Sequence, residues 1–154
     1  MYTGSCLCGG VMYEVDGELE PIQVCHCSQC RKAQGSAFVT NIPVSTSAFR
    51  VLQGEGMLSS FESSPGKFRV FCKTCGSPIY SKRTDLPEAL RLRAGTLDGE
   101  LETRPIGHFY FGSRANWFQI NDDLPKFPAA YTPGKTQRQP EAAGAEQGGG
   151  EKGS

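Results

Sequence analysis

The sequence predicts a small all-β domain of short antiparallel strands that is pinned by zinc. Short runs of β-forming residues follow one another along the chain, and turns rich in glycine and proline separate them. Seven cysteines fall in closely spaced groups, a pattern typical of metal sites. The 154 residues suffice for one domain with its own core, which we expect to span residues 1–131.

Alternation of side chains predicts the strands in chain order. Val11, Tyr13 and Val15 form one face of a strand over 11–16. Residues 28–34 are expected to form a short helical turn that ends at Gly35. Further strands are expected at 37–42 (stopping at Pro43), 49–52, 58–61, 67–71, 78–82, 90–94 and 107–111.

Three expectations concern the later part of the chain. Leu90 and Leu92 alternate with Arg91 and Arg93, which predicts a strand with one solvent-exposed face. Trp117 is expected in the core. Residues 132–154 contain no large apolar side chain, so we expect a disordered tail.

Composition excludes several classes of protein. Sixteen basic and sixteen acidic residues give a net charge of zero, which argues against a nucleic-acid or anionic-membrane binder. No apolar run is long enough to span a membrane, and the N-terminus has no signal pattern. We therefore expect a cytoplasmic protein with reduced thiols, in which paired cysteines are metal ligands rather than disulfides.

Three thiols within six residues form the most informative motif, which we call the claw: Cys25, Cys27 and Cys30. In an extended segment Cys25 and Cys27 share a face, and a tight turn brings Cys30 to the same point. Zinc suits three sulfurs, and a three-ligand zinc keeps one position for a substrate. The alternative is a second structural zinc, with a fourth ligand such as His108.

The other four cysteines predict a closed zinc site. Cys6 and Cys8 with Cys72 and Cys75 would join the first strand to the central hairpin, with Gly76 free to adopt a positive φ. Two alternatives stay open: four free buried thiols, or Cys6 or Cys8 completing the claw.

Charged and aromatic side chains near these motifs are candidates for substrate binding. Arg31 follows the claw directly and suits a substrate carboxylate, although ordinary surface charge explains it equally well. His26 is expected to pack or to form hydrogen bonds away from the metal. His108 is a candidate proton carrier or hydrogen-bond donor behind the metal ligands.

Taken together, these segments resemble the glutathione-dependent formaldehyde-activating enzyme family, which includes centromere protein V-like proteins. The matching pieces are residues 4–10 (GSCLCGG), 25–32 (CHCSQCRK), 71–77 (FCKTCGS), 95–98 (GTLD), 105–108 (PIGH), Trp117 and 124–127 (LPKF). The resemblance covers residues 4 to 127, in the family's order and spacing.

The resemblance implies a β-tent fold and two Zn²⁺ ions, one structural and one catalytic. It implies a structural ion on Cys6, Cys8, Cys72 and Cys75, and a catalytic ion on Cys25, Cys27 and Cys30. It also implies a carbon–sulfur lyase that adds glutathione to formaldehyde, giving S-hydroxymethylglutathione.

In that reaction Arg31 or Arg114 is expected to pair with a glutathione carboxylate, and His108 or water to supply a proton. The other hypothesis is a non-catalytic, zinc-stabilised module that carries glutathione or docks on a protein.

Overall fold

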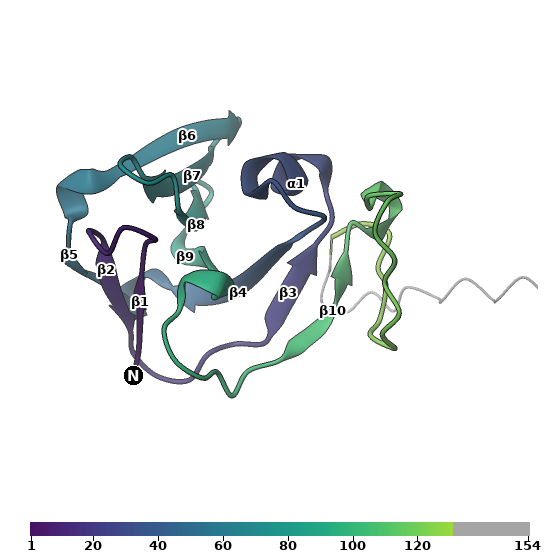
Figure 1. Ribbon diagram of the computed structural model, residues 1–154, viewed down its shortest axis with the longest axis horizontal. Coiled ribbons are helices and arrows are strands. Elements are labelled where there is room, and N and C mark those ends of the chain that lie inside the picture. The colour runs from purple at the N-terminus through teal and green to yellow at the C-terminus, as the bar shows by residue number, and fades with distance from the viewer. Residues whose placement is uncertain (131–154) are drawn as a thin grey trace, which may run out of the picture.

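The computed structural model describes residues 1–130, which form ten strands, one α-helix and four short 3-10 turns (Figure 1). The predicted tail at 132–154 lies outside the described residues, as does residue 131. The strands are β1 (Tyr2–Ser5), β2 (Met12–Val15), β3 (Ile22–Cys25), β4 (Val39–Ser45), β5 (Phe49–Gln53), β6 (Leu58–Ser64), β7 (Lys67–Cys72), β8 (Pro78–Arg83), β9 (Leu86–Arg93) and β10 (Pro105–Phe109). The helix is α1 (Ser28–Gln34), and the 3-10 turns are Thr46–Ala48, Glu55–Met57, Ala94–Thr96 and Phe111–Ser113.

The strands build two sheets, which confirms the predicted all-β, β-tent class. The smaller sheet has the order β1-β2-β5, and the larger has the order β10-β3-β4-β9-β8-β7-β6. Among the strands of residues 1–130 all pairs are antiparallel except one, so the prediction of antiparallel strands is wrong at β10, which pairs with β3 in parallel. A parallel neighbour requires a long connection between the two strands, and here most of the domain lies between them.

The core lies between the small sheet and one face of the large sheet. Ile42 and Leu92, paired across β4 and β9, are fully buried there, as are Val11 and Tyr13 from the N-terminal segment. Apolar burial of this kind is the main source of stability for a small domain.

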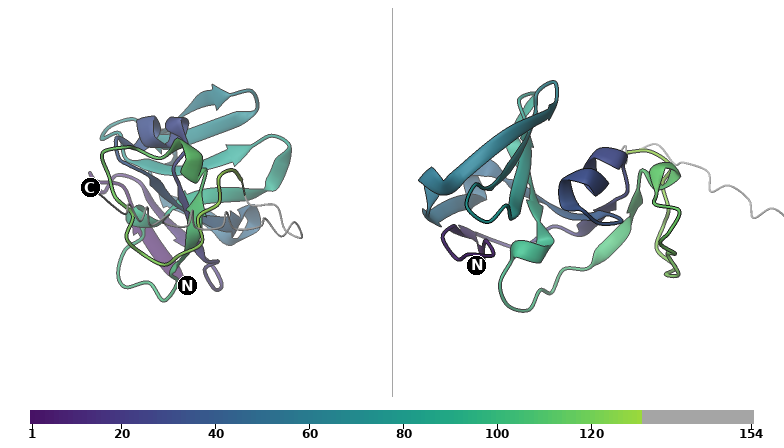
Figure 2. Two further views of the ribbon diagram at one scale, coloured as in Figure 1. Left: turned by 90° about the vertical axis from the view of Figure 1, so that its right-hand side faces the viewer. Right: turned by 45° about the horizontal axis from the view of Figure 1, so that its top comes forward.

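The opposite face of the large sheet is polar, and it carries the claw. The strand register puts the following residues on this face: Cys25 of β3, Val39 and Asn41 of β4, Arg93 and Arg91 of β9, Ser81 of β8, and Arg69 of β7. Helix α1 follows β3 and packs against β4 on this side. Figure 1 and the right-hand view of Figure 2 show α1 on the β3–β4 side and the β6–β7 hairpin rising on the other.

The prediction that the strand at residues 90–94 exposes one face to solvent is wrong, because other segments enclose this polar face. Only 4% of Arg93 is exposed, because the sheet and its neighbouring segments enclose the side chain. The predicted core position of Trp117 is also wrong, since 68% of this residue is exposed. Strand β4 continues through Pro43, where β3 no longer pairs with it and a missing N–H is tolerated.

Among residues 1–130, no helix combines the length and apolar character that crossing a membrane requires.

Candidate metal centre

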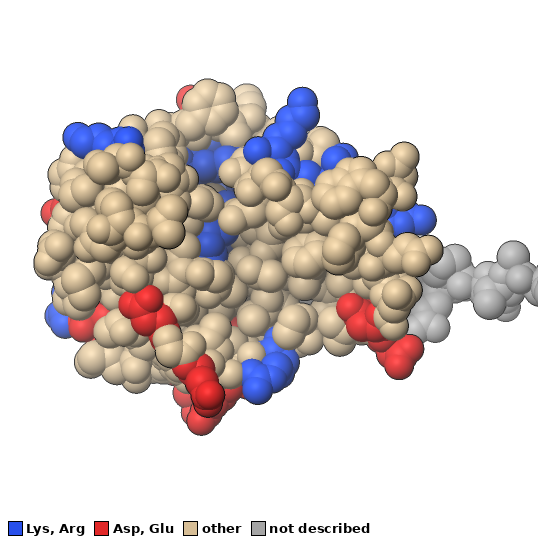
Figure 3. Space-filling view, viewed as in Figure 1, with Lys and Arg blue, Asp and Glu red and all other residues tan. Residues whose placement is uncertain are grey.

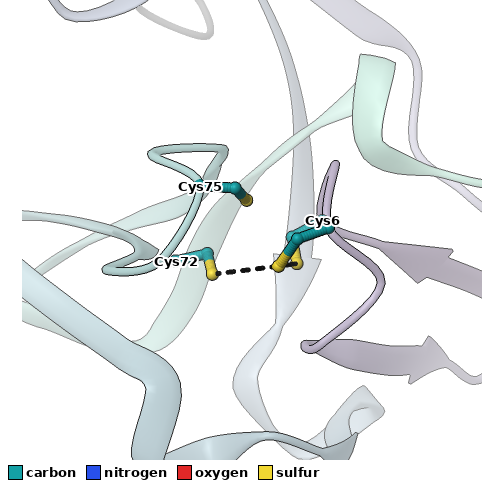
Figure 4. A group of neighbouring side chains, drawn as sticks. Cys6, Cys72 and Cys75 are labelled. Carbon is teal, nitrogen blue, oxygen red and sulfur yellow. Dashed lines mark hydrogen bonds between the residues drawn. The ribbon is translucent and has the colours of Figure 1, made fainter.

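Four cysteines from opposite ends of the domain meet in the first cluster. Cys6 and Cys8 follow β1, and Cys72 and Cys75 lie at the turn from β7 to β8. Their sulfurs all lie within 4.8 Å of one another. Figure 4 shows the sulfurs of Cys6, Cys72 and Cys75 turned toward a common point. The alternative in which Cys6 or Cys8 completes the claw is therefore not what the structure shows.

Local backbone geometry holds the two halves of this cluster together. Gly76 has a φ of +77°, which an L side chain rarely adopts, and its N–H bonds to the carbonyl of Cys72 at 2.8 Å. The Leu7 N–H donates to the Ser77 hydroxyl at 2.9 Å, which links the two cysteine loops directly. Four thiols converging from two loops are the donor set of a structural zinc site.

The claw forms where β3 ends and α1 begins. Cys25 is the last residue of β3, and Cys27 is the N-cap of α1, so the first helical turn returns Cys30 toward both. The Cys27 sulfur accepts the N–H of Cys30 at 3.4 Å. The helix ends at Gly35, as predicted. The three sulfurs lie within 4.8 Å of one another, in the arrangement that the spacing predicts.

The environment of the claw favours thiolate at Cys30. Hydrogen bonds from Cys25 and Cys27, with the nearby charge of Arg69, hold the pKa of Cys30 far below its ordinary value. The same shared protons raise the pKa of Cys25 far above its ordinary value. The Arg69 guanidinium nitrogens lie 3.8 and 3.9 Å from the Cys30 sulfur. A proton-sharing group of three thiols beside a cation is suited to a metal ion that takes thiolate ligands.

Within residues 1–130 no fourth cysteine, histidine or carboxylate joins the claw. His108, the fourth ligand considered above, has both ring nitrogens engaged elsewhere. Its Nδ1 lies 2.8 Å from Nε2 of His26, and its Nε2 lies 2.9 Å from a carboxylate oxygen of Asp122. The donor set therefore fits a zinc ion with three protein ligands.

His26, His108 and Asp122 form a chain of hydrogen bonds, and the donor and acceptor in each bond follow from the chemistry of the groups. A carboxylate only accepts, so His108 donates from Nε2 to Asp122, and its Nδ1 then accepts a hydrogen bond from the Nε2–H of His26. Burial lowers the pKa of His26 to about 4, so His26 is neutral at neutral pH. The prediction that His26 packs and hydrogen-bonds away from the claw is confirmed.

A group of basic side chains on β7 and β9 faces the claw. Arg69 and Arg93 are buried and Lys67 is half-buried. In residues 1–130 the ion pairs involve Glu14, Asp85 and Asp122, and none of these carboxylates pairs with the three bases. Burial lowers the pKa of Arg93 to about 10, which still leaves it charged at neutral pH.

A cavity of about 720 Å³ lies between the C-terminal end of α1 and the four-cysteine cluster. Its walls come from the Cys6 loop, the end of α1 with the segment after it, and the turn that follows β9. Arg93 lines it, together with the hydroxyl side chains of Ser36, Thr40 and Ser77. Figure 3 shows a hollow in the molecule, with Lys and Arg atoms inside it.

The other predicted substrate residues lie around the histidine chain. Arg31 is half-buried on α1, and its Nε is buried without a hydrogen-bond partner. Arg114 is exposed and lies over the Phe111 ring, 4.5 Å from its centroid. Sequence reasoning missed Arg69, Arg93 and Asp122 as site residues, although alternation puts Arg93 on the same face of its strand as Arg91.

Comparison with known proteins agrees with this arrangement. The sequence model of the family described as glutathione-dependent formaldehyde-activating enzyme matches residues 1–113. An uncharacterized lyase of Schizosaccharomyces pombe is 31% identical over 84 residues, which cover 54% of this chain and 59% of that relative. A crystal structure of a Rhodobacter sphaeroides protein is similar with a TM-score of 0.56 and 25% identity, covering 66% of this chain and 97% of that one.

Proposed function

Because the chain belongs to the glutathione-dependent formaldehyde-activating enzyme family, we propose that it is a lyase-type enzyme that adds the glutathione thiol to a small electrophile. Formaldehyde is the electrophile that the family description names, and the product is then S-hydroxymethylglutathione. The reverse reaction breaks the same carbon–sulfur bond. The observation that carries this proposal is the claw, which gathers three ligand sulfurs and, among residues 1–130, no fourth.

Cys25, Cys27 and Cys30 are the residues that would hold the catalytic zinc, and Cys6, Cys8, Cys72 and Cys75 the structural one. Zinc at the claw would lower the pKa of a thiol that joins it, which makes that sulfur a nucleophile at neutral pH. Arg69 contributes by placing a positive charge against Cys30 and so favouring thiolate over thiol at the claw.

The addition balances without an oxidant or a reductant. The sulfur–carbon bond forms, the carbonyl π bond breaks, and the proton that leaves the thiol ends on the new hydroxyl oxygen. We assign His108 to this proton movement, with its ring held by hydrogen bonds to His26 at 2.8 Å and to Asp122 at 2.9 Å. We also assign Arg31 and Arg114 to the carboxylates of glutathione, and for Arg31 the buried, unpartnered Nε supports this role. Seven free thiols suit a reducing, cytoplasmic location.

The test is calorimetric titration of glutathione into zinc-loaded protein, in two buffers of different ionisation heat. We expect glutathione to bind with release of a proton, and S-methylglutathione to bind much more weakly, because a thioether is a poor ligand for zinc. Product formation from glutathione and formaldehyde, followed by nuclear magnetic resonance, should exceed the rate without protein.

Two results would contradict the proposal in different ways. Equal binding of S-methylglutathione, with no proton release, would show that the claw is not the thiol site. Proton-linked binding without any rate above the uncatalysed reaction would identify a glutathione carrier rather than an enzyme.

A further inference from the structure

We propose that Arg93 is a specificity-determining residue that binds a carboxylate of the thiol substrate in the cavity between α1 and the four-cysteine cluster. The inference rests on the proposed function and narrows its substrate class to thiols that carry a carboxylate away from the sulfur. It adds to the assignment of Arg31 and Arg114 a residue inside the cavity.

The strand register puts Arg93 within reach of a substrate held at the claw. Cys25 pairs with Val39 on β4, and Arg93 pairs with Asn41 on the same strand, two residues further along. Two strand spacings, roughly 10 Å, and two residues along the strand, roughly 7 Å, therefore put the backbones of Cys25 and Arg93 roughly 12 Å apart on one face of the sheet. A tripeptide whose sulfur lies at the claw is long enough for a carboxylate to meet the guanidinium between them.

The guanidinium of Arg93 has one N–H donor, at Nε, without a hydrogen-bond partner. It donates from Nη1 to the side-chain oxygen of Asn41 and to the carbonyl of Arg91. Its Nε is buried and has no hydrogen-bond partner. Since 96% of the residue is shielded from solvent and it lines the cavity, an unpaired donor here is costly unless a ligand accepts from it.

Charge at the site also favours an anionic ligand. Three thiolates on a zinc ion leave one net negative charge, and Arg69 lies against Cys30, where it offsets that charge. The positive charges of Arg93 and Lys67 are then not offset by the metal site, and no carboxylate among residues 1–130 forms an ion pair with either. Buried charges in proteins are usually paired, so the missing partner is expected to come with the ligand.

The cavity has the size and lining of a small-molecule site. Its volume of about 720 Å³ falls within the range of roughly 300–1,000 Å³ that is typical of ligand pockets. Five residues with hydroxyl side chains line it with Arg93, and such groups supply neutral hydrogen bonds for a peptide-like substrate. A guanidinium gives such a substrate a directional, two-pronged carboxylate contact.

The test compares glutathione with two analogues, in each of which one carboxylate is replaced by a primary amide. In the zinc-loaded wild-type protein, one analogue is expected to bind roughly 10- to 100-fold more weakly than glutathione, as for a lost charged hydrogen bond. The Arg93→Gln variant should bind glutathione only as tightly as it binds that analogue, so the difference in affinity between the two ligands should disappear. The readout is the dissociation constant from calorimetry, together with the released proton.

Arg91→Gln is the matched control, because Arg91 lies on the same strand and face but does not line this cavity. The control should keep the discrimination between glutathione and its amide. If Arg93→Gln does not fold, Arg93→Lys should keep a reduced discrimination, and the wild-type comparison still decides.

Equal affinity of both amide analogues and glutathione for the wild-type protein would overturn the inference. The inference would also fail if Arg93→Gln kept the full discrimination. With proton release intact, either result leaves the proposed function standing. If the zinc-loaded wild-type protein binds none of these thiols, both the inference and the proposed function are overturned.

Discussion

Replacing Arg69 by glutamine should weaken metal binding at the claw and leave the four-cysteine site intact. The two terminal nitrogens of Arg69 lie 3.8 and 3.9 Å from the Cys30 sulfur, and the side chain is buried. Two unit charges about 4 Å apart interact by about 4 kcal/mol at an effective dielectric constant of about 20. Desolvation of the guanidinium offsets part of this, and charged hydrogen bonds contribute roughly 1.5–3 kcal/mol. The claw should therefore bind zinc roughly 10- to 100-fold more weakly in Arg69→Gln.

The assay is competition with a chromogenic zinc chelator, which reports two release steps in the wild-type protein. Only the earlier step should move to lower chelator concentration in Arg69→Gln, and the four-cysteine site serves as the internal reference. Arg69→Lys should recover part of the affinity, because it keeps the charge but not the two-nitrogen contact. The exposed Arg83, which pairs with Asp85 at the surface, provides the control variant Arg83→Gln. An unchanged first step, or an equal shift of both steps, would refute the role of Arg69.

Further predictions concern stability. Cys72→Ser should unfold the domain because Cys72 is fully buried in the core, whereas Cys27→Ser should leave a folded protein with one zinc. Circular dichroism and the zinc content of each variant check this. Equal losses of melting temperature in the two variants would contradict it. Stability should fall by about 2–3 kcal/mol as pH rises from about 10 to 12, because burial raises the pKa of Tyr13 to about 12 and the unfolded chain releases that proton first. Urea unfolding across this range should show the fall in the wild-type protein but not in Tyr13→Phe. Gly4→Ala should lower the melting temperature clearly, because the added Cβ would overlap Cζ and the hydroxyl oxygen of Tyr13 and would lie 2.6 Å from the Thr96 carbonyl oxygen. A melting temperature equal to wild type would show that the ring moves aside without cost.

Spacing along the chain was sufficient to predict the claw. Cys25, Cys27 and Cys30 lie within six residues, so local backbone geometry brings their sulfurs together wherever the rest of the chain goes. Helix α1 is equally local, with its N-cap at Cys27 and its end at Gly35. Most strands could be predicted for the same reason, since alternation is visible within one segment.

Features that depend on distant segments could not be predicted in this way. Alternation showed that Arg91 and Arg93 share a face, but not that other segments enclose that face and bury Arg93. The parallel pairing of β10 with β3 brings His108 beside Val24, and nothing in either segment alone indicates it. Asp122 completes the histidine chain from a segment without regular secondary structure.

The two metal clusters differ in how much of the chain must exist before each can form. All three claw thiols leave the ribosome within one short segment, so this segment can collect its sulfurs before most of the sheet has been synthesised. The four-cysteine cluster must wait for Cys72 and Cys75, and its sulfurs meet only after the β7–β8 turn docks against the N-terminal loop. Closure of that cluster is therefore an event of domain assembly, and a chain that stops before Cys72 leaves Cys6 and Cys8 without their two partner thiols.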